Sequence, residues 1–175
     1  NANSMGKGSI EGIAEDSSGM LWFGSTDGLT RYNPKANQFT VFENNPTDKY
    51  SLSNNHVYSI IEDKAGMLWI GTDKGVNLFN PKEERFYLVG GDFKDSAQLE
   101  KSMIHHIYKD KQGQLWISSF GYGVFVVDPD SKKCIAHYEH NPKDPNSIGS
   151  NIVFAITQDL TGNYWVSTEG GLYNF

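Results

Sequence analysis

Cysteine, basic residues and long apolar runs are all scarce in this sequence, and each scarcity excludes a class of protein. The one cysteine, Cys134, rules out an internal disulfide and a cysteine-rich zinc site. The 15 lysines and arginines are outnumbered by 21 aspartates and glutamates, and they form no basic stripe, so no nucleic-acid partner is expected. Because no apolar run is longer than a strand, no membrane contact is expected either.

Signatures of catalysis are also missing. The sequence contains no Gly-x-Ser-x-Gly elbow, no phosphate-binding loop and no dinucleotide fingerprint. We therefore predict no catalytic residue and no cofactor. The 175 residues are enough for one domain with a sizeable core. Residues 1–8 are set aside as a tag remnant and leader, and the segment is expected to come from a longer protein.

What the chain does contain is a fourfold repeat. All four tryptophans end the same motif, Asp-x-x-Gly-x-x-Trp, and follow one another at intervals of 47, 47 and 49 residues. Such a period indicates a repeat architecture. The repeated positions, which we interpret as structural, are Asp16, Gly19, Trp22, Asp63, Gly66, Trp69, Asp110, Gly113, Trp116, Asp159, Gly162 and Trp165.

Each repeat predicts four short strands. The first ends at the aspartate, whose side chain can hydrogen-bond the backbone two residues on, while the motif's glycine tolerates a positive φ. The second strand carries the tryptophan. The third ends before Pro34, Pro81 or Pro129, where proline stops the ladder, and the fourth begins five residues later.

Four strands in about 47 residues are typical of a propeller blade. We predict an all-β fold, a β-propeller of four consecutive four-stranded blades at about residues 9–43, 56–89, 103–139 and 152–175. The tryptophans should be buried between adjacent blades.

Four blades are few for a propeller, and the last unit ends before an outer strand could form. We therefore expect a partial ring of a seven- or eight-bladed propeller, which a head-to-tail homodimer could complete. The connections 44–55, 90–102 and 140–151 are polar and predict surface loops. The middle one has gained Phe93 and Leu99.

The segment Ser59–Val76 closely resembles the repeat of the two-component regulator propeller family, and the phrase Asn45–Asp48 is similar to that family's linkers. The likeness covers nearly the whole chain from about Ser9. Ser118 and Ser167 depart from it, because they stand where the second unit has a glycine, Gly71.

The resemblance implies the periplasmic sensor region of a hybrid two-component histidine kinase. Such a sensor takes an oligosaccharide from glycan breakdown as its ligand, and the receptor is a dimer anchored in the inner membrane. The fragment itself would be non-catalytic and would contribute to signal transduction. Two alternatives stay open: a propeller lyase or glycan-cleaving enzyme, which needs a histidine or paired carboxylates in a non-repeating cluster near the axis, and a protein-binding scaffold.

The aspartates are similar to the aspartate boxes of sialidase propellers. A sialidase needs several arginines to hold a carboxylate, whereas this chain has only Arg31 and Arg85, at unrelated points of their repeats. Because the aspartates recur in every unit, we interpret them as turn residues.

Two histidine patterns invite a metal or catalytic interpretation. In Cys134-x-x-His137-x-x-His140, strand residues three apart should point to opposite faces, so we predict a core role for Cys134 and no metal. The pair His105-His106 lies in an alternating strand, so only one can face inward, and we predict strand histidines with protein partners.

Phe120 and Tyr122 flank a glycine turn whose counterparts carry small or charged residues. Aromatic faces stack on sugar rings, so these two are the candidate ligand-binding residues, with packing against a neighbouring blade as the alternative.

Overall fold

The computed structural model describes residues 7–90 and 96–174, whose strands form four antiparallel sheets. The first sheet contains β1 (Ile10–Glu15), β2 (Leu21–Ser25), β3 (Gly28–Asn33) and β4 (Gln38–Phe42). The second contains β5 (Val57–Glu62), β6 (Leu68–Thr72), β7 (Gly75–Asn80) and β8 (Arg85–Leu88). The third contains β9 (Ile104–Lys109), β10 (Leu115–Ser119), β11 (Val124–Asp128) and β12 (Lys133–Tyr138). The fourth contains β13 (Val153–Gln158), β14 (Tyr164–Thr168) and β15 (Gly171–Asn174).

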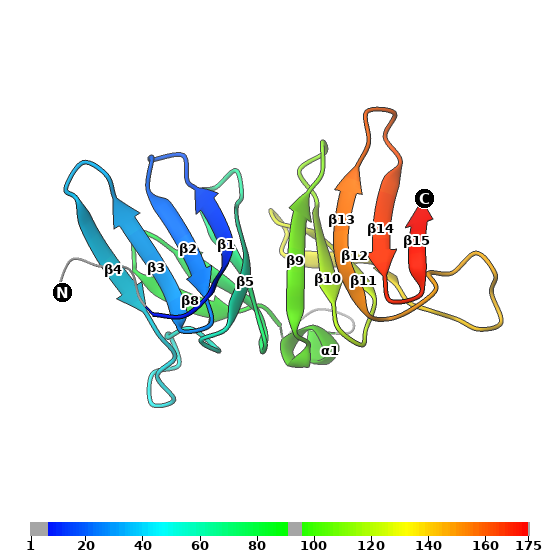
Figure 1. Cartoon of the computed structure of the whole chain (residues 1–175), viewed down its shortest axis with the longest axis horizontal. Coiled ribbons are helices and arrows are strands. Elements are labelled where there is room, and N and C mark those ends of the chain that lie inside the picture. Colours follow the sequence, from blue (N-terminus) through cyan, green and yellow to red (C-terminus); the bar gives the residue numbers. More distant parts are fainter. Residues whose placement is uncertain (1–6, 91–95, 175) are drawn as a thin grey trace.

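The first strands of the four sheets stand together at the centre of the molecule. β1 contacts β5, β5 contacts β9, and β9 contacts β13, while the later strands of each sheet lie progressively further out. Figure 1 shows the sheets fanning around these inner strands, with the first and last sheets at opposite ends. This is the arrangement of consecutive propeller blades, so the predicted all-β propeller is confirmed. The fourth blade has three strands, as its sequence indicated.

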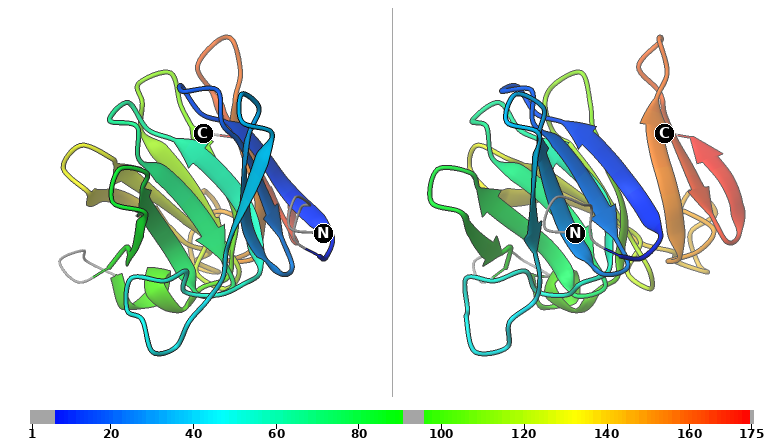
Figure 2. Two further views of the ribbon diagram at one scale, coloured as in Figure 1. Left: turned by 90° about the vertical axis from the view of Figure 1, so that its left-hand side faces the viewer. Right: turned by 60° about the vertical axis from the view of Figure 1, so that its left-hand side comes forward.

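The apolar core lies in the seams between blades, where Figure 2 shows the sheets packed face to face. Trp22, Trp69 and Trp116 fill the three seams and are 0%, 0% and 4% exposed. Trp165 is 37% exposed, because no described blade follows it. The predicted burial therefore holds wherever a following blade exists.

Each seam also takes an isoleucine from the blade that follows. Ile60, Ile107 and Ile156 are at most 9% exposed, whereas their counterpart in the first blade, Ile13, is 69% exposed. The last blade therefore shows the tryptophan side of a seam to solvent, and the first blade shows the isoleucine side.

Glycine lets the first two seams close tightly. A Cβ at Gly24 would lie 2.8 Å from the Val57 carbonyl oxygen, and one at Gly71 would lie 2.7 Å from the Ile104 carbonyl oxygen. In the third blade Ser118 takes this position and is fully buried, with no hydrogen-bond partner for its hydroxyl in the described parts of the chain. The departure from the family repeat is therefore accommodated in the seam.

The polar composition of the connections between blades predicted surface loops, but the structure shows that they also contribute to the core. Each inserts one apolar side chain into a seam: Leu52, Leu99 and Ile148 are all at most 1% exposed. The middle connection forms the helix α1 (Ser96–Lys101), which carries Leu99. Composition alone conceals this role because a single buried residue per loop has no periodicity. Phe93 lies outside the described residues.

Candidate functional site

The four repeated aspartates are fully engaged in their turns. In the second blade, Oδ1 of Asp63 accepts hydrogen bonds from the backbone N–H groups of Ala65 and Met67 at 2.9 and 3.0 Å. Its Oδ2 accepts from Nε1 of Trp69 at 2.8 Å. The other three motifs repeat all of these bonds. The aspartates thus lock each turn to its tryptophan, a partnership that sequence reasoning missed.

In the first and fourth motifs these bonds favour the ionised carboxylate. Although burial by itself would raise the pKa of Asp16, hydrogen bonds from Ser18 and Trp22 hold the pKa below its ordinary value of 3.8. Hydrogen bonds from Trp165 and Thr161 hold the pKa of Asp159 well below the same value. Both oxygens of each aspartate thus accept hydrogen bonds within the motif, which supports a structural role for these residues.

At the end of every blade that lies opposite the Asp-x-x-Gly turn, two positions carry a different type of residue in each repeat. Each inner strand contains a bulge, an extra residue that pairs with nothing on the next strand, and the turn between the second and third strands lies beside it. The bulge residues are Glu11, Tyr58, His105 and Phe154. The turn residues are Thr26, Asp73, Phe120 and Glu169. The backbone therefore repeats here while the chemistry changes from blade to blade, which is the pattern of a binding surface.

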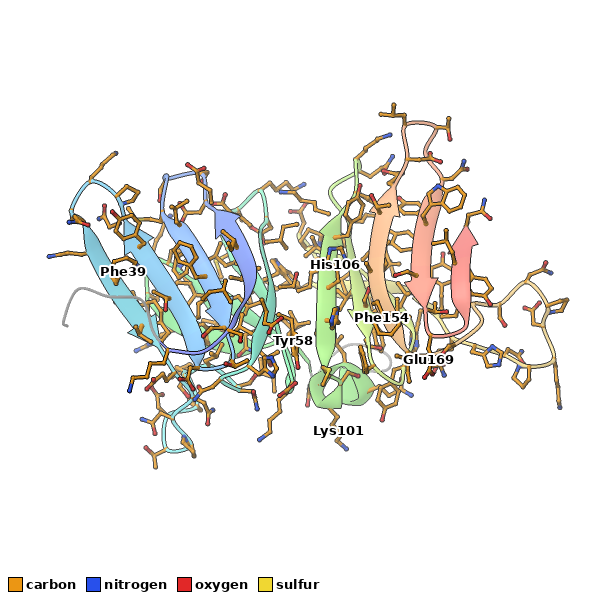
Figure 3. All side chains as sticks on the ribbon, in the orientation of Figure 1. Phe39, Tyr58, Lys101, His106, Phe154 and Glu169 are labelled. Carbon is orange, nitrogen blue, oxygen red and sulfur yellow. The ribbon has the colours of Figure 1, made fainter. Side chains whose placement is uncertain are left out.

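Four of these variable residues and one neighbour, His56, form a continuous cluster of rings that we call the aromatic row. Its members are His56, Tyr58, His105, Phe120 and Phe154. Tyr58 stacks on His56 at 4.1 Å and on His105 at 5.5 Å between ring centroids. His105 lies 5.7 Å from Phe120 and 6.1 Å from Phe154, and the two phenylalanines are 5.5 Å apart. The row spans the second, third and fourth blades. Figure 3 shows Tyr58 and Phe154 near the centre of the molecule, toward the end that carries α1.

The hydroxyl of Tyr58 is held on both sides. It donates to Oδ1 of Asp73 at 2.8 Å and lies 3.0 Å from Nδ1 of His56. Burial, and then the hydrogen bond and negative charge of Asp73, raise the pKa of Tyr58 far above its ordinary value of 10.0. Tyr58 therefore stays protonated and its ring is fixed in place. Nε2 of His56 is buried and has no partner in the described residues.

The adjacent histidines have different roles, and both have protein partners. Nδ1 of His106 accepts from the backbone N–H of Ile156 in the next blade, as the hydroxyl of Ser59 accepts from Ile107 one seam earlier. Burial, with His105 beside it, lowers the pKa of His106 below 6.5. Nδ1 of His105 lies 3.0 Å from the carbonyl oxygen of Phe154. His106 thus belongs to the seam and His105 to the aromatic row.

The two aromatic candidates from the sequence diverge in the structure. Phe120 is half-buried and belongs to the aromatic row. Tyr122 packs against the core cluster between the second and third blades. Sequence reasoning missed His56, Tyr58 and Phe154. The signal that could have found them is the lack of similarity at equivalent positions of the four repeats.

The predicted divergence of Cys134 and His137 is wrong. Ile135 is an extra residue of β12 that pairs with nothing on β11, and this bulge shifts the register so that Cys134 pairs with Val127 and His137 pairs with Phe125. Both side chains therefore face the same seam, where Cys134 packs against the core and His137 stacks on Phe125 at 4.0 Å.

Neither histidine of this motif is arranged with Cys134 as a metal ligand. Nε2 of His137 lies 2.7 Å from the Tyr122 carbonyl, and Nδ1 of His140 lies 2.8 Å from the Ile148 carbonyl. Within residues 7–90 and 96–174 no three His, Cys, Asp or Glu side chains gather as metal ligands would. In the same residues no helix is long and apolar enough to cross a membrane.

The two arginines lie on outer strands. Arg31 of β3 pairs with Glu84 at 2.7 Å, and Arg85 of β8 lies over the ring of Tyr50 at 4.7 Å. They do not converge on one site, so the arrangement a sialidase needs is not built from them.

Comparison with known proteins identifies the repeat. Residues 51–74 and 98–121 match the family model described as two component regulator propeller. No curated protein matches the chain. Two extracellular domains from B. thetaiotaomicron are similar in structure. One, described as a hybrid two component system, has 27% identity and a TM-score of 0.79 over 100% of this chain and 22% of its own. The other, described as a one component system, has 26% identity and a TM-score of 0.79 over 99% and 24%.

Two segments of the chain therefore match the two-component regulator propeller repeat, and the chain spans about a quarter of the length of those extracellular domains. Both neighbours are extracellular, which confirms the predicted extracytoplasmic character of the domain. The virginiamycin B lyase of Staphylococcus aureus is also similar, with a TM-score of 0.60 over 95% of this chain and 55% of its own. At 14% identity, that likeness shows the propeller fold alone.

Proposed function

We propose that this chain is a non-catalytic segment of the periplasmic sensor of a hybrid two-component histidine kinase, and that it binds an oligosaccharide released from a glycan. The likeness to extracellular domains of two-component systems supports the sensor role. In the intact receptor, ligand binding would shift the populations of two dimer arrangements.

The aromatic row is where we place the ligand, and it is the observation that carries the proposal. Its residues come from three blades, occupy positions that the fold leaves free to vary, and keep partly exposed ring faces. Phe154 is 38% exposed. Apolar ring faces bordered by a few fixed polar groups are typical of small-molecule sites, and such faces stack on the C–H faces of sugars.

The proposal is tested by binding on the isolated 175-residue protein. An oligosaccharide array selects a ligand, and calorimetry then compares wild type with Phe154→Ala. We expect that variant to bind about two- to tenfold more weakly, since a stacking contact contributes roughly 0.5–1.5 kcal/mol. The matched control is Leu160→Ala, because Leu160 is 97% exposed in the turn at the other end of the same blade. Equal affinity of wild type and Phe154→Ala would remove the row from ligand binding.

A lyase is the second candidate, because the row places a histidine, His105, in a non-repeating cluster beside the inner strands. We expect no turnover. The hydroxyl of Tyr58, the nearest acid group of the row, is held by Asp73 and has a raised pKa. The measurement is product formation from the polysaccharide whose oligomer binds. Turnover that disappears in His105→Ala would replace the sensor proposal with an enzyme.

The protein-binding scaffold stays as the remaining alternative. Failure of every oligosaccharide to bind, with a protein captured in a way that depends on Phe154, would favour it.

A further inference from the structure

The imidazole of His105 has a defined tautomer, and this property of the aromatic row constrains the ligand. The Nδ1 atom lies 3.0 Å from the carbonyl oxygen of Phe154, which can only accept a hydrogen bond. Nδ1 therefore carries a proton, and in the neutral ring Nε2 presents a lone pair. Nε2 has no hydrogen-bond partner among residues 7–90 and 96–174.

The other polar groups of the row have no proton to offer. The Tyr58 hydroxyl gives its proton to Asp73, so it accepts its second hydrogen bond from Nδ1 of His56. The backbone N–H groups of Phe120 and Gly121 donate to the carbonyls of Met103 and Asn151. What the row presents to a ligand is one acceptor, Nε2 of His105, between aromatic faces.

The charges near the row also favour an uncharged ligand. The hydroxyl of Tyr58 experiences the negative charges of Asp73 and Glu11, which help to raise its pKa. A carboxylate or sulfate group needs N–H or O–H donors or a cation when it leaves water, and with neutral imidazoles the row supplies none from its own side chains. A sugar hydroxyl, in contrast, can donate to Nε2 of His105.

We infer that the row selects an uncharged sugar that donates a hydroxyl hydrogen bond to Nε2 of His105, and that it rejects uronic and sulfated sugars. This inference rests on the proposed function and narrows its ligand class. Phe120 and Phe154 supply the stacking faces, and His105 determines specificity.

The test compares two variants and two ligand classes by calorimetry. The probes are neutral cello-, xylo- and manno-oligosaccharides and, as the anionic class, oligogalacturonates and chondroitin sulfate oligosaccharides. We expect a neutral probe to bind and the anionic probes to bind at least about tenfold more weakly. His105→Phe keeps a ring for stacking and removes the acceptor, so it should weaken neutral binding about two- to tenfold, which is what one lost hydrogen bond produces.

A second measurement does not depend on the variant folding normally. The O-methylated form of the neutral probe keeps its acceptors and loses its donors, so wild type should bind it at least about tenfold more weakly. If Phe154→Ala loses binding while His105→Phe and the methylated probe bind normally, the inference fails and the proposed function stands. If wild type binds an anionic probe more tightly than the neutral probes, the inference likewise fails and the proposed function stands. If wild type binds no saccharide, both fail.

Discussion

Among single residues, the departures from the repeat divide into those that serve the fold and those that serve the surface. His106 replaces Ser59 of the preceding blade, yet it accepts the same interblade hydrogen bond from the next inner strand. His105, one residue earlier, instead donates to the carbonyl oxygen of Phe154 on that strand, and its ring belongs to the aromatic row. The sequence indicated partners for both histidines but could not assign these roles, because His105 is itself the bulge residue and interrupts the alternation on which such an assignment depends.

His106 should make stability depend on pH. Its pKa in the folded protein is below its ordinary value of 6.5, because burial and then His105 oppose its charge. The unfolded chain therefore binds more protons as the pH falls below about 6.5, and this contribution to stability is lost there, while it is fully present above that pH.

The measurement is the melting temperature between neutral and mildly acidic pH. His106→Ser keeps the hydrogen bond, as Ser59 shows, and removes the titrating ring. We expect a smaller acid-induced decrease in the variant than in wild type. An equal decrease in both would contradict the role of His106.

For strands and turns, the sequence was informative wherever a local rule applied. The Asp-x-x-Gly turns follow from side-chain hydrogen bonding over two residues, and their glycines indeed have φ between 78° and 103°. The register shift in β12 was not predictable, because one inserted residue reverses the faces of Cys134 and His137 without changing the composition. The same reason hid the inner-strand bulges, and with them most of the aromatic row.

Equivalent tryptophans should contribute differently to the free energy of unfolding, because they differ in how far a seam between blades buries them. Trp69→Ala should lower the free energy of unfolding by about 3–5 kcal/mol, because the side chain is fully buried. Trp165→Ala is the matched control in the same motif; in the single chain Trp165 is 37% exposed, so the loss should be well under half of that unless a second copy covers it. Urea denaturation measures both, and similar losses would show that the fourth blade is covered in solution.

The whole molecule is an open arc of blades with two different ends. The outward face of the first blade carries Ile13, Leu21, Phe23, Tyr32 and Phe39, whose counterparts in the second blade are all buried in a seam. Figure 3 places Phe39 at the far side of that blade. The last blade ends in Trp165 and Leu172, both exposed. The repeat predicted these consecutive blades, because the repeating units can be counted in the sequence.

We propose that the two ends associate head to tail, giving a homodimer in which the Trp165 side of one copy meets the Ile13 side of the other. Light scattering on a sizing column should then give a molar mass near twice 19.6 kDa. Ile13→Glu places a charge in that seam and should give the monomer. Ile135→Glu is the control, because Ile135 is 50% exposed on an outer strand. A monomeric wild type would contradict the association without affecting the aromatic row.

The most direct test of the account maps where a saccharide touches the protein. Amide chemical shifts of the isotope-labelled protein are followed as a neutral oligosaccharide is added. We predict that the largest changes occur at Tyr58, His105, Phe120 and Phe154, where the repeat breaks, and that the Asp-x-x-Gly turns at the other end stay unchanged. Changes concentrated at those turns or on the outer strands would contradict the central claim that the aromatic row is the ligand site.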